Sequence, residues 1–190
     1  MKSKNKITAK MLQSNIDYKG MALFFKIRDF LKPPMNKIKK SKVNQGDHVL
    51  DYGCGPGSYS FAVAEVVGEE GMVYAADIHP IAIEKVRKKV EKKNIANIAT
   101  ILTSCSTNLT DNSIDVVICF DVMHAIADRY ELLKEFYRVL KPEGYLSLDD
   151  HHYSEDEIVE IVSNGNLFQL EEQVDKIFNF KKKESVNPHI

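Results

Sequence analysis

Three alternating glycines and two aspartates are the residues of this chain whose types and spacing could do chemistry together. Gly53, Gly55 and Gly57 stand in one short loop, with Asp51 two residues before the first of them and Asp77 further along the chain. Glycine adopts backbone angles that are closed to other residues, and it lets a ligand approach the main chain closely. Carboxylates beside such a loop can accept hydrogen bonds from hydroxyl and ammonium groups. The pattern therefore predicts a binding site for a nucleoside-like ligand.

Two classes of nucleotide-binding loop compete for this pattern. A dinucleotide-binding loop has the form GxGxxG and turns a helix N-terminus toward a pyrophosphate, but Ser58 stands where its third glycine would fall. A carboxylate at Asp51 also fits a pyrophosphate poorly, and it suits a ligand that carries a cationic amino group and a sulfonium. A phosphate-binding P-loop is excluded because the chain has no Gly-Lys-Ser/Thr sequence. Asp77 can bind both hydroxyls of a ribose. A dinucleotide and a sulfonium nucleoside both contain a ribose, so Asp77 alone does not distinguish between them.

Three histidines add candidate proton carriers. His124 stands after an apolar run, and His151 and His152 follow directly on Asp149 and Asp150. Histidine exchanges protons near neutral pH, so we predict His124 and His151 as general bases. The structural alternatives are packing against the next helix or capping of it, for His124, and a polar loop that leads into a helix, for the Asp-Asp-His-His run.

The same run could also contact a substrate or hold a metal ion. Adjacent histidines point in different directions on an extended chain, so two of these rings on one ion are not expected, and we predict no metal site. The three cysteines give neither a disulfide framework nor a zinc-binding spacing. Cys54 lies inside the glycine loop, where we expect it to offer its backbone amide and not to act as a nucleophile.

Composition points to one domain without a nucleic-acid or membrane partner. The chain has 190 residues, 44% of them hydrophobic and 28% charged, and a formal net charge of -1. A protein held by phosphates needs a basic surplus, and we interpret the lysine run that begins at Lys37 as a solvated face. No apolar core of a signal peptide follows the basic N-terminus, and no apolar stretch is long enough to span a membrane. We therefore expect a cytoplasmic protein.

The expected secondary structure places the candidate residues at one edge of a sheet. We predict strands over residues 48–52, 72–76, 98–102, 114–120, 145–148, 168–173 and 176–180. We predict helices over residues 14–31, 35–40, 58–67, 80–93, 127–140 and 155–164. This alternation is typical of a parallel sheet that helices cover on both faces, and such sheets bind ligands at the carboxyl ends of their strands.

Four segments, in this order, resemble motifs of the class I S-adenosylmethionine-dependent methyltransferases. Residues 49–57 (VLDYGCGPG) closely resemble the first motif of that family, and Asp77 matches its ribose-binding acid. Residues 115–120 resemble its fourth strand, and residues 138–144 resemble the helix end and turn before its fifth strand. The resemblance covers roughly residues 45–180. It implies an α/β fold with a Rossmann-like, doubly wound, seven-stranded sheet, mostly parallel with an antiparallel last strand, in three α/β/α layers.

The resemblance also implies a cofactor and its contacts. It predicts that S-adenosylmethionine is bound by residues of the loop and the strand ends, namely Asp51, Gly53, Cys54, Gly55, Gly57, Asp77, Ile78, Ser104, Cys105 and Phe120. After its third strand the family often has an acidic residue that meets the adenine amino group. This chain has Ser104-Cys105-Ser106 there, so we expect the Cys105 amide and a serine hydroxyl to meet the ring.

The resemblance implies methyl transfer, and the chain favours a small-molecule acceptor. It has no insertion large enough to suggest a substrate domain, and Phe120-Asp121-Val122-Met123 replaces the Asn-Pro-Pro-Tyr signature for amino groups on bases or glutamine. A histidine base would serve an oxygen, nitrogen or acidic carbon nucleophile. The alternatives are an NAD(P)-dependent oxidoreductase and a non-catalytic protein that binds S-adenosylmethionine.

We predict three parts along the chain. Residues 1–44 form an N-terminal helical cap, residues 45–183 form the methyltransferase domain, and residues 184–190 form a tail. The cap helix carries three phenylalanines on a broad apolar face, which serve either as a lid over an apolar substrate or as plain core packing: Phe24, Phe25 and Phe30.

Overall fold

The computed structural model describes residues 33–183. The chain divides into two compact units, Met1–Pro33 and Pro34–Ile190, and nearly all the described residues belong to the second. The predicted helix over residues 14–31, its three phenylalanines and the predicted tail lie outside the described residues. Residues 34–44, which we assigned to the N-terminal cap, belong to the second unit, where Ile38 and Val43 are buried in a core cluster.

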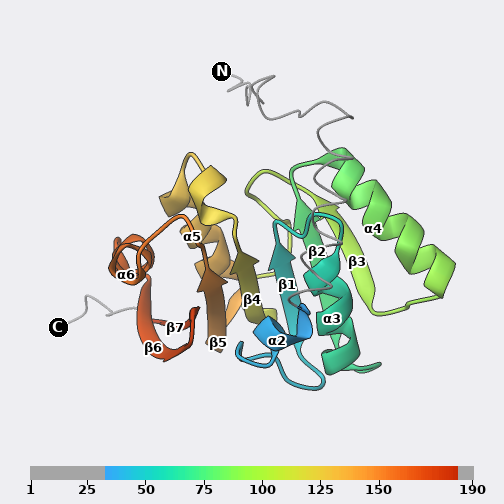
Figure 1. The fold of residues 1–190 in the computed structure, drawn as a ribbon, viewed down its shortest axis with the longest axis horizontal. Helices are drawn as coiled ribbons and strands as arrows, with labels where there is room; N and C mark the ends of the chain where they lie inside the picture. Colours follow the sequence, from blue (N-terminus) through green and yellow to red (C-terminus); the bar gives the residue numbers. More distant parts are fainter. Residues whose placement is uncertain (1–32, 184–190) are drawn as a thin grey trace. The chain divides into compact units, whose positions relative to one another are not determined.

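Seven strands form one sheet in the order β3-β2-β1-β4-β5-β7-β6 (Figure 1). The strands are β1 (His48–Tyr52), β2 (Met72–Asp77), β3 (Ile98–Leu102), β4 (Ile114–Phe120), β5 (Leu140–Asp149), β6 (Phe168–Val174) and β7 (Ile177–Lys182). Strands β1 to β5 pair in parallel, whereas β7 pairs antiparallel with both β5 and β6. The mostly parallel sheet with an antiparallel last strand is therefore confirmed.

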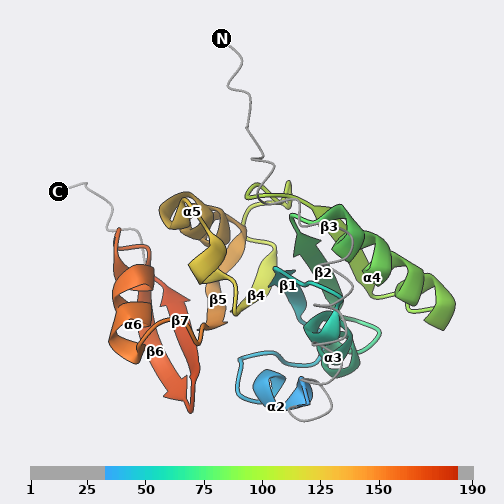
Figure 2. The ribbon, with the colours of Figure 1, turned by 45° about the horizontal axis from the view of Figure 1, so that its top comes forward.

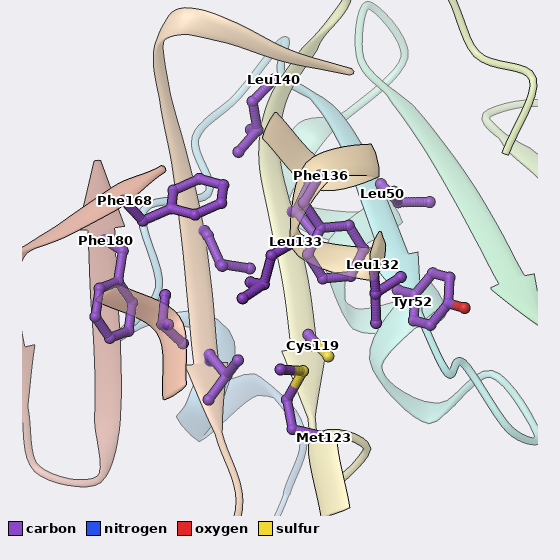
Figure 3. Close-up of a cluster of buried hydrophobic side chains, with 14 of the residues drawn as sticks. Leu50, Tyr52, Cys119, Met123, Leu132, Leu133, Phe136, Leu140, Phe168 and Phe180 are labelled. Carbon is purple, nitrogen blue, oxygen red and sulfur yellow. The ribbon is translucent and has the colours of Figure 1, made fainter. Parts of the chain in front are cut away.

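Helices cover both faces of this sheet (Figures 1 and 2). They are α2 (Met35–Ile38), α3 (Ser58–Val67), α4 (Pro80–Lys93), the 3₁₀ turn η1 (Met123–Ala125), α5 (Arg129–Val139) and α6 (Glu155–Ser163). Successive strand residues point to opposite faces, so Val49 packs with α2, α3 and α4, while Leu50 packs with α5 and α6. Figure 3 shows the second of these clusters, in which Phe136, Phe168 and Phe180 are fully buried. The three-layer architecture is confirmed.

Local signals account for most element boundaries; several differ from the prediction by one or two residues, and the start of β5 differs most. Helix α5 begins at Arg129, because the Asp128 side chain caps it by accepting a hydrogen bond from the Glu131 amide. Strand β5 begins earlier than predicted, at Leu140, because Leu140 already pairs with Ile114. The turn residues Pro142 to Gly144 are thus an irregularity inside the strand pairing and not a loop before it.

The order of the strands determines where a ligand can bind. β1 lies between β2 and β4, so the chain leaves β1 in one direction across the sheet and returns past it to form β4. A crevice opens outside the carboxyl ends of the strands at such a reversal. The candidate residues lie at or just after the ends of β1, β2, β3, β4 and β5. Among the described helices, none combines the length and the apolarity that crossing a bilayer requires.

Candidate cofactor and acceptor site

The glycine loop between β1 and α3 has a conformation that requires glycine. The backbone angle φ is +79° at Gly53, +52° at Gly55 and +88° at Gly57, which is the left-handed region that other residues rarely adopt. A Cβ atom on Gly53 would come within 2.3 Å of a methyl carbon of Val122. The loop backbone therefore lies directly against the segment that follows β4.

Backbone hydrogen bonds tie this loop to the end of β2. The amides of Gly53 and Cys54 both donate to the carbonyl oxygen of Ala76, at 2.8 and 3.0 Å. The Gly55 amide donates to Oδ2 of Asp77 at 2.8 Å. Three hydrogen bonds to the end of β2 thus fix the conformation of the loop in the absence of a ligand.

Asp77 has a structural task that the sequence analysis missed. Its Oδ1 accepts a hydrogen bond from the His79 amide at 2.7 Å, while Oδ2 accepts the bond from Gly55. Burial raises the pKa of Asp77, and the two amide bonds oppose that rise. Each carboxylate oxygen can accept a further hydrogen bond, so the group can order the loop and still receive the hydroxyls of a sugar.

Asp51 is a buried carboxyl group at the end of β1. Only 3% of the residue is exposed, and its Oδ2 accepts a hydrogen bond from the hydroxyl of Ser60 at 2.5 Å. Burial raises the pKa of Asp51 to about 7; the Ser60 bond opposes the rise, and the negative charge of Asp77 adds to it. This bond ties the end of β1 to α3, since Ser60 lies in the first turn of that helix.

The turn after β3 is closed by hydrogen bonds of its own. The amide of Cys105, which we expected to meet an adenine ring, donates to Oγ1 of Thr103 at 3.1 Å. That hydroxyl in turn donates to the carbonyl oxygen of Ser106 at 2.5 Å. Ser104 is exposed and Ile78 is half-buried beside Asp77. The adenine contacts of this turn therefore stay a prediction.

The Cys54 amide, which we expected a ligand to receive, already donates to the Ala76 carbonyl oxygen, so its contact with a ligand stays a prediction. The Cys54 side chain is buried in the cluster that contains α3 and α4. Burial raises the pKa of the Cys54 thiol well above its ordinary value. Because the thiolate is the nucleophilic form, this residue is unsuited to nucleophilic catalysis.

Lys37 is a part of the site that the sequence analysis placed wrongly. We interpreted its lysine run as a solvated face, but Nζ of Lys37 lies 2.5 Å from Oδ2 of Asp149 and 3.4 Å from Oδ2 of Asp121. It also lies 5.2 Å from the ring centroid of Phe120 and 5.5 Å from that of Tyr59. No local signal in the sequence distinguishes this lysine from its neighbours, because its partners come from the far ends of β4 and β5.

The histidines gather on two aspartates where β4 and β5 end. Nδ1 of His124 and Nδ1 of His152 each lie 2.9 Å from the carboxylate of Asp150, on different oxygens. Nδ1 of His151 lies 2.7 Å from Oδ1 of Asp121. Both predicted bases are therefore paired with a carboxylate, and His152, which we did not predict as a site residue, joins them.

Asp150 is the centre of this arrangement. Its side chain is fully buried, and it accepts hydrogen bonds from the backbone amides of His124 and His152 at 2.9 and 3.1 Å. Burial alone would raise the pKa of Asp150, but these amides and the two rings lower it to about 2. The carboxylate therefore stays ionised at physiological pH and orients both imidazoles.

Asp121 supports His151 in the same way on the neighbouring strand end. It has a left-handed φ of +55°, and its amide donates to the Asp149 carbonyl oxygen at 2.9 Å. Burial acts to raise the pKa of Asp121, yet the bond from His151 and the charge of Lys37 hold it below its ordinary value. The ring of His151 is 68% exposed, so it is accessible to a small molecule.

Known proteins resemble this chain over most of the second unit. A family model described as a methyltransferase domain matches residues 43–185. Demethylmenaquinone methyltransferase of Lactobacillus johnsonii is 34% identical over 113 residues, which are 58% of this chain and 46% of that protein. The protein of the same name from Geobacillus sp. is 31% identical over 128 residues, which are 67% of this chain and 55% of that protein. The chain spans about half the length of these curated relatives.

A solved structure shares the fold described above. The S-adenosylmethionine-dependent methyltransferase from Aquifex aeolicus superposes with a TM-score of 0.74 at 26% identity, covering 82% of this chain and 91% of that chain. These comparisons give the NAD(P)-dependent oxidoreductase alternative no support. With a matching family model over residues 43–185 and the predicted seven-stranded sheet, the chain belongs to the methyltransferase-domain family, with the Rossmann-like fold of the class I S-adenosylmethionine-dependent methyltransferases.

Proposed function

We propose that this protein is an S-adenosylmethionine-dependent methyltransferase that acts on a small-molecule acceptor. The observation that carries the proposal is the glycine loop, whose conformation is fixed by hydrogen bonds to Asp77 and to the Ala76 carbonyl oxygen at the end of β2. A side chain at Gly53 would collide with Val122, and two carboxyl groups lie beside the loop, Asp77 on the Gly55 amide and Asp51 at the end of β1. The site thus fits a nucleoside with a cationic amino-acid end.

The residues that we propose as cofactor ligands divide by strand end. Asp77 with Ile78 would take the ribose and one face of the adenine, and the turn at Ser104 and Cys105 its edge. The remaining contacts would come from the loop and the ends of β1 and β4, through Asp51, Gly53, Cys54, Gly55, Gly57 and Phe120. When bound, S-adenosylmethionine supplies a methyl group that its sulfonium already activates.

The protein's own residues have to bind the acceptor, exclude water and move one proton. Asp121 and Asp150 orient His151 and His124 through their Nδ1 atoms. In each ring Nε2 is then the nitrogen that can take a proton from an acceptor. We propose His151 and His124 as the candidate general bases, His151 being the more exposed of the two.

The proposed acceptor rests on the names of the relatives and on the elements found among the described residues. Both curated relatives named above are demethylmenaquinone methyltransferases, so a quinol-type small molecule is the first acceptor to test. The described residues contain no inserted domain for a macromolecular substrate. All three cysteines are free thiols, which supports a reducing compartment, and we propose the cytoplasm.

Ligand-induced stabilisation tests the cofactor. S-Adenosylhomocysteine at 100 times its Kd is expected to stabilise the folded protein by about 2.7 kcal/mol, whereas NAD is expected to leave it unchanged. Thermal unfolding monitored by circular dichroism measures both. Equal stabilisation by NAD, or none by S-adenosylhomocysteine, would contradict the proposal. Stabilisation without methyl transfer to any acceptor would leave the non-catalytic alternative standing.

Replacement of His151 tests the proton transfer. The His151→Ala variant is expected to lower kcat for an acceptor with an ionisable hydroxyl by about 10²-fold or more, because a positioned base contributes roughly that factor. Its Kd for S-adenosylhomocysteine should stay unchanged, as measured by calorimetry. His48→Ala is the matched control, since His48 lies at the start of β1, at the opposite end of the strands. Full turnover by His151→Ala would remove His151 from the mechanism.

A further inference from the structure

We propose that His124, Asp150 and His152 form a binding site for a divalent transition-metal ion, of which Zn²⁺ is the first to test. From the sequence we predicted no metal site, because the adjacent rings of His151 and His152 point in different directions on an extended chain. The structure instead joins His152 to a histidine that is distant in the sequence. His124 arrives on the turn after β4, and Asp150 and His152 arrive on the turn after β5.

The three side chains offer ligand atoms at the spacing of a coordination shell. One nitrogen or oxygen from each lies within 4.8 Å of the others. Nδ1 of His124 lies 2.9 and 3.2 Å from the two oxygens of Asp150, and Nδ1 of His152 lies 2.9 Å from Oδ1. With ligand bonds of about 2.1 Å, neighbouring ligands of a tetrahedral ion lie about 3.4 Å apart. The distances of both Nδ1 atoms from Oδ1 of Asp150, 3.2 and 2.9 Å, are within about half an ångström of that spacing.

The chemistry of the donor set selects a particular class of ion. Two imidazole nitrogens and one carboxylate oxygen are the three protein ligands of catalytic zinc sites, which leave a further position open. Ca²⁺ and Mg²⁺ prefer oxygen ligands, and no thiol belongs to this cluster. The site is thus expected to favour Zn²⁺ or Co²⁺ over Mg²⁺.

The three side chains differ in burial: the carboxylate is buried and both imidazole rings are partly exposed. The Asp150 side chain has no exposed surface, whereas the rings of His124 and His152 are 32% and 46% exposed. The backbone amides of both histidines donate to Asp150, and such outer contacts hold a ligating carboxylate in place. The open side of the site consequently faces solvent, from which an ion can enter.

A single general base does not require this arrangement. One carboxylate orients one imidazole in a catalytic pair, as Asp121 does for His151. Asp150 instead has two imidazoles directed at it, with ring centroids only 3.7 Å apart. A bound ion would give both Nδ1 atoms one shared partner beside Asp150.

The bound ion would lie where it could bind the acceptor. Its open position lies at the same strand ends as His151, so it can take an oxygen of the acceptor or a water molecule. This consequence rests on the proposed methyltransferase function, whereas the metal site does not. With His124 coordinating the ion through Nδ1, His151 would remain as the candidate general base.

Calorimetry on the full chain, free of any histidine tag and stripped by a chelator, tests the site. Titration with ZnCl₂ is expected to show one equivalent bound, and the affinity should fall by at least about tenfold in Asp150→Asn and in His152→Ala. His48→Ala removes one histidine, as His152→Ala does, but removes no ligand, because His48 lies at the start of β1, so this control should bind Zn²⁺ as the unaltered protein does. The visible spectrum of the Co²⁺ form should lack the thiolate band that a cysteine ligand produces.

Three outcomes would overturn the proposal: no uptake, uptake that Asp150→Asn and His152→Ala leave unchanged, or a thiolate band. Circular dichroism and stabilisation by S-adenosylhomocysteine show whether each variant is folded, and His152→Ala provides the test if Asp150→Asn unfolds, because its ring is half-exposed. Zinc binding by a protein that S-adenosylhomocysteine does not stabilise would support the metal site and contradict the proposed function.

Discussion

The Gly53→Ala variant is expected to lose measurable cofactor binding and about 2–4 kcal/mol of the free energy of unfolding, whereas Gly46→Ala loses only about 1 kcal/mol and binds normally. The two glycines have nearly the same φ, +79° at Gly53 and +82° at Gly46. Their surroundings differ, because a Cβ on Gly53 meets Val122 at 2.3 Å and a Cβ on Gly46 meets nothing within 4 Å. The pair of variants therefore separates backbone strain from the close approach that the loop requires.

The loss of binding follows from the same geometry. To accommodate a methyl group, Gly53 has to move away from Val122, and its amide then leaves the Ala76 carbonyl oxygen. The loop would then lose the backbone conformation that the hydrogen bond from the Gly55 amide to Asp77 maintains. Urea unfolding measures the stability of both variants, and calorimetry with S-adenosylhomocysteine measures the binding. Equal losses in the two variants would show that only the positive φ matters.

Asp51→Asn is expected to make the ligand-free protein more stable at pH 8 while it weakens cofactor binding by at least about tenfold. The pKa of Asp51 is raised from 3.8 to about 7, first of all by burial. Between those two values the folded protein holds a proton that the unfolded chain has released. Stability therefore falls as the pH rises from about 4 to about 7, and it stays low above that range.

An amide at position 51 has no proton to lose, so the variant lacks this decline. It can still accept the hydroxyl of Ser60. Since one pKa unit corresponds to about 1.4 kcal/mol, the expected gain at pH 8 is about 2–4 kcal/mol. Urea unfolding at pH 5 and pH 8 measures it, with Asp156→Asn as the control on an exposed turn of α6. Parallel pH profiles of Asp51→Asn and the unaltered protein would contradict the expectation.

The binding side of the same experiment has its own pH signature. A cationic amino group favours the ionised form of Asp51, and a proton competes with it. The affinity of the unaltered protein for S-adenosylhomocysteine should therefore rise by about tenfold from pH 6 to pH 8, as a carboxyl group with a pKa of about 7 ionises. The Asp51→Asn variant should bind weakly and without that rise. A tenfold rise in the variant would place the titrating group elsewhere.

Local signals in the sequence were sufficient for most of the fold. The bounds of β1, α3, α4, β3 and β4 agree with the prediction, because apolar periodicity, the glycines at both ends of α3 and the proline that starts α4 act within a few residues. The capping box that starts α6 joins Ser154 and Glu157, only three residues apart. The type of sheet and the ligand-binding edge then followed from the family resemblance and from the rule for parallel sheets.

The contacts that define the site depend on segments that are distant along the chain. Asp51 was predicted as a ligand, but its buried partner Ser60 was not, and Lys37 was assigned to solvent although it contacts Asp149. His124 lies 26 residues from Asp150, and no pattern of residue types reveals that their strand ends meet at this spacing. The sequence by itself determined the elements, the glycine loop and the two acids beside it. Only the tertiary structure decided which side chains share a carboxylate, because burial and hydrogen-bond distance arise when the sheet brings the ends of β4 and β5 together.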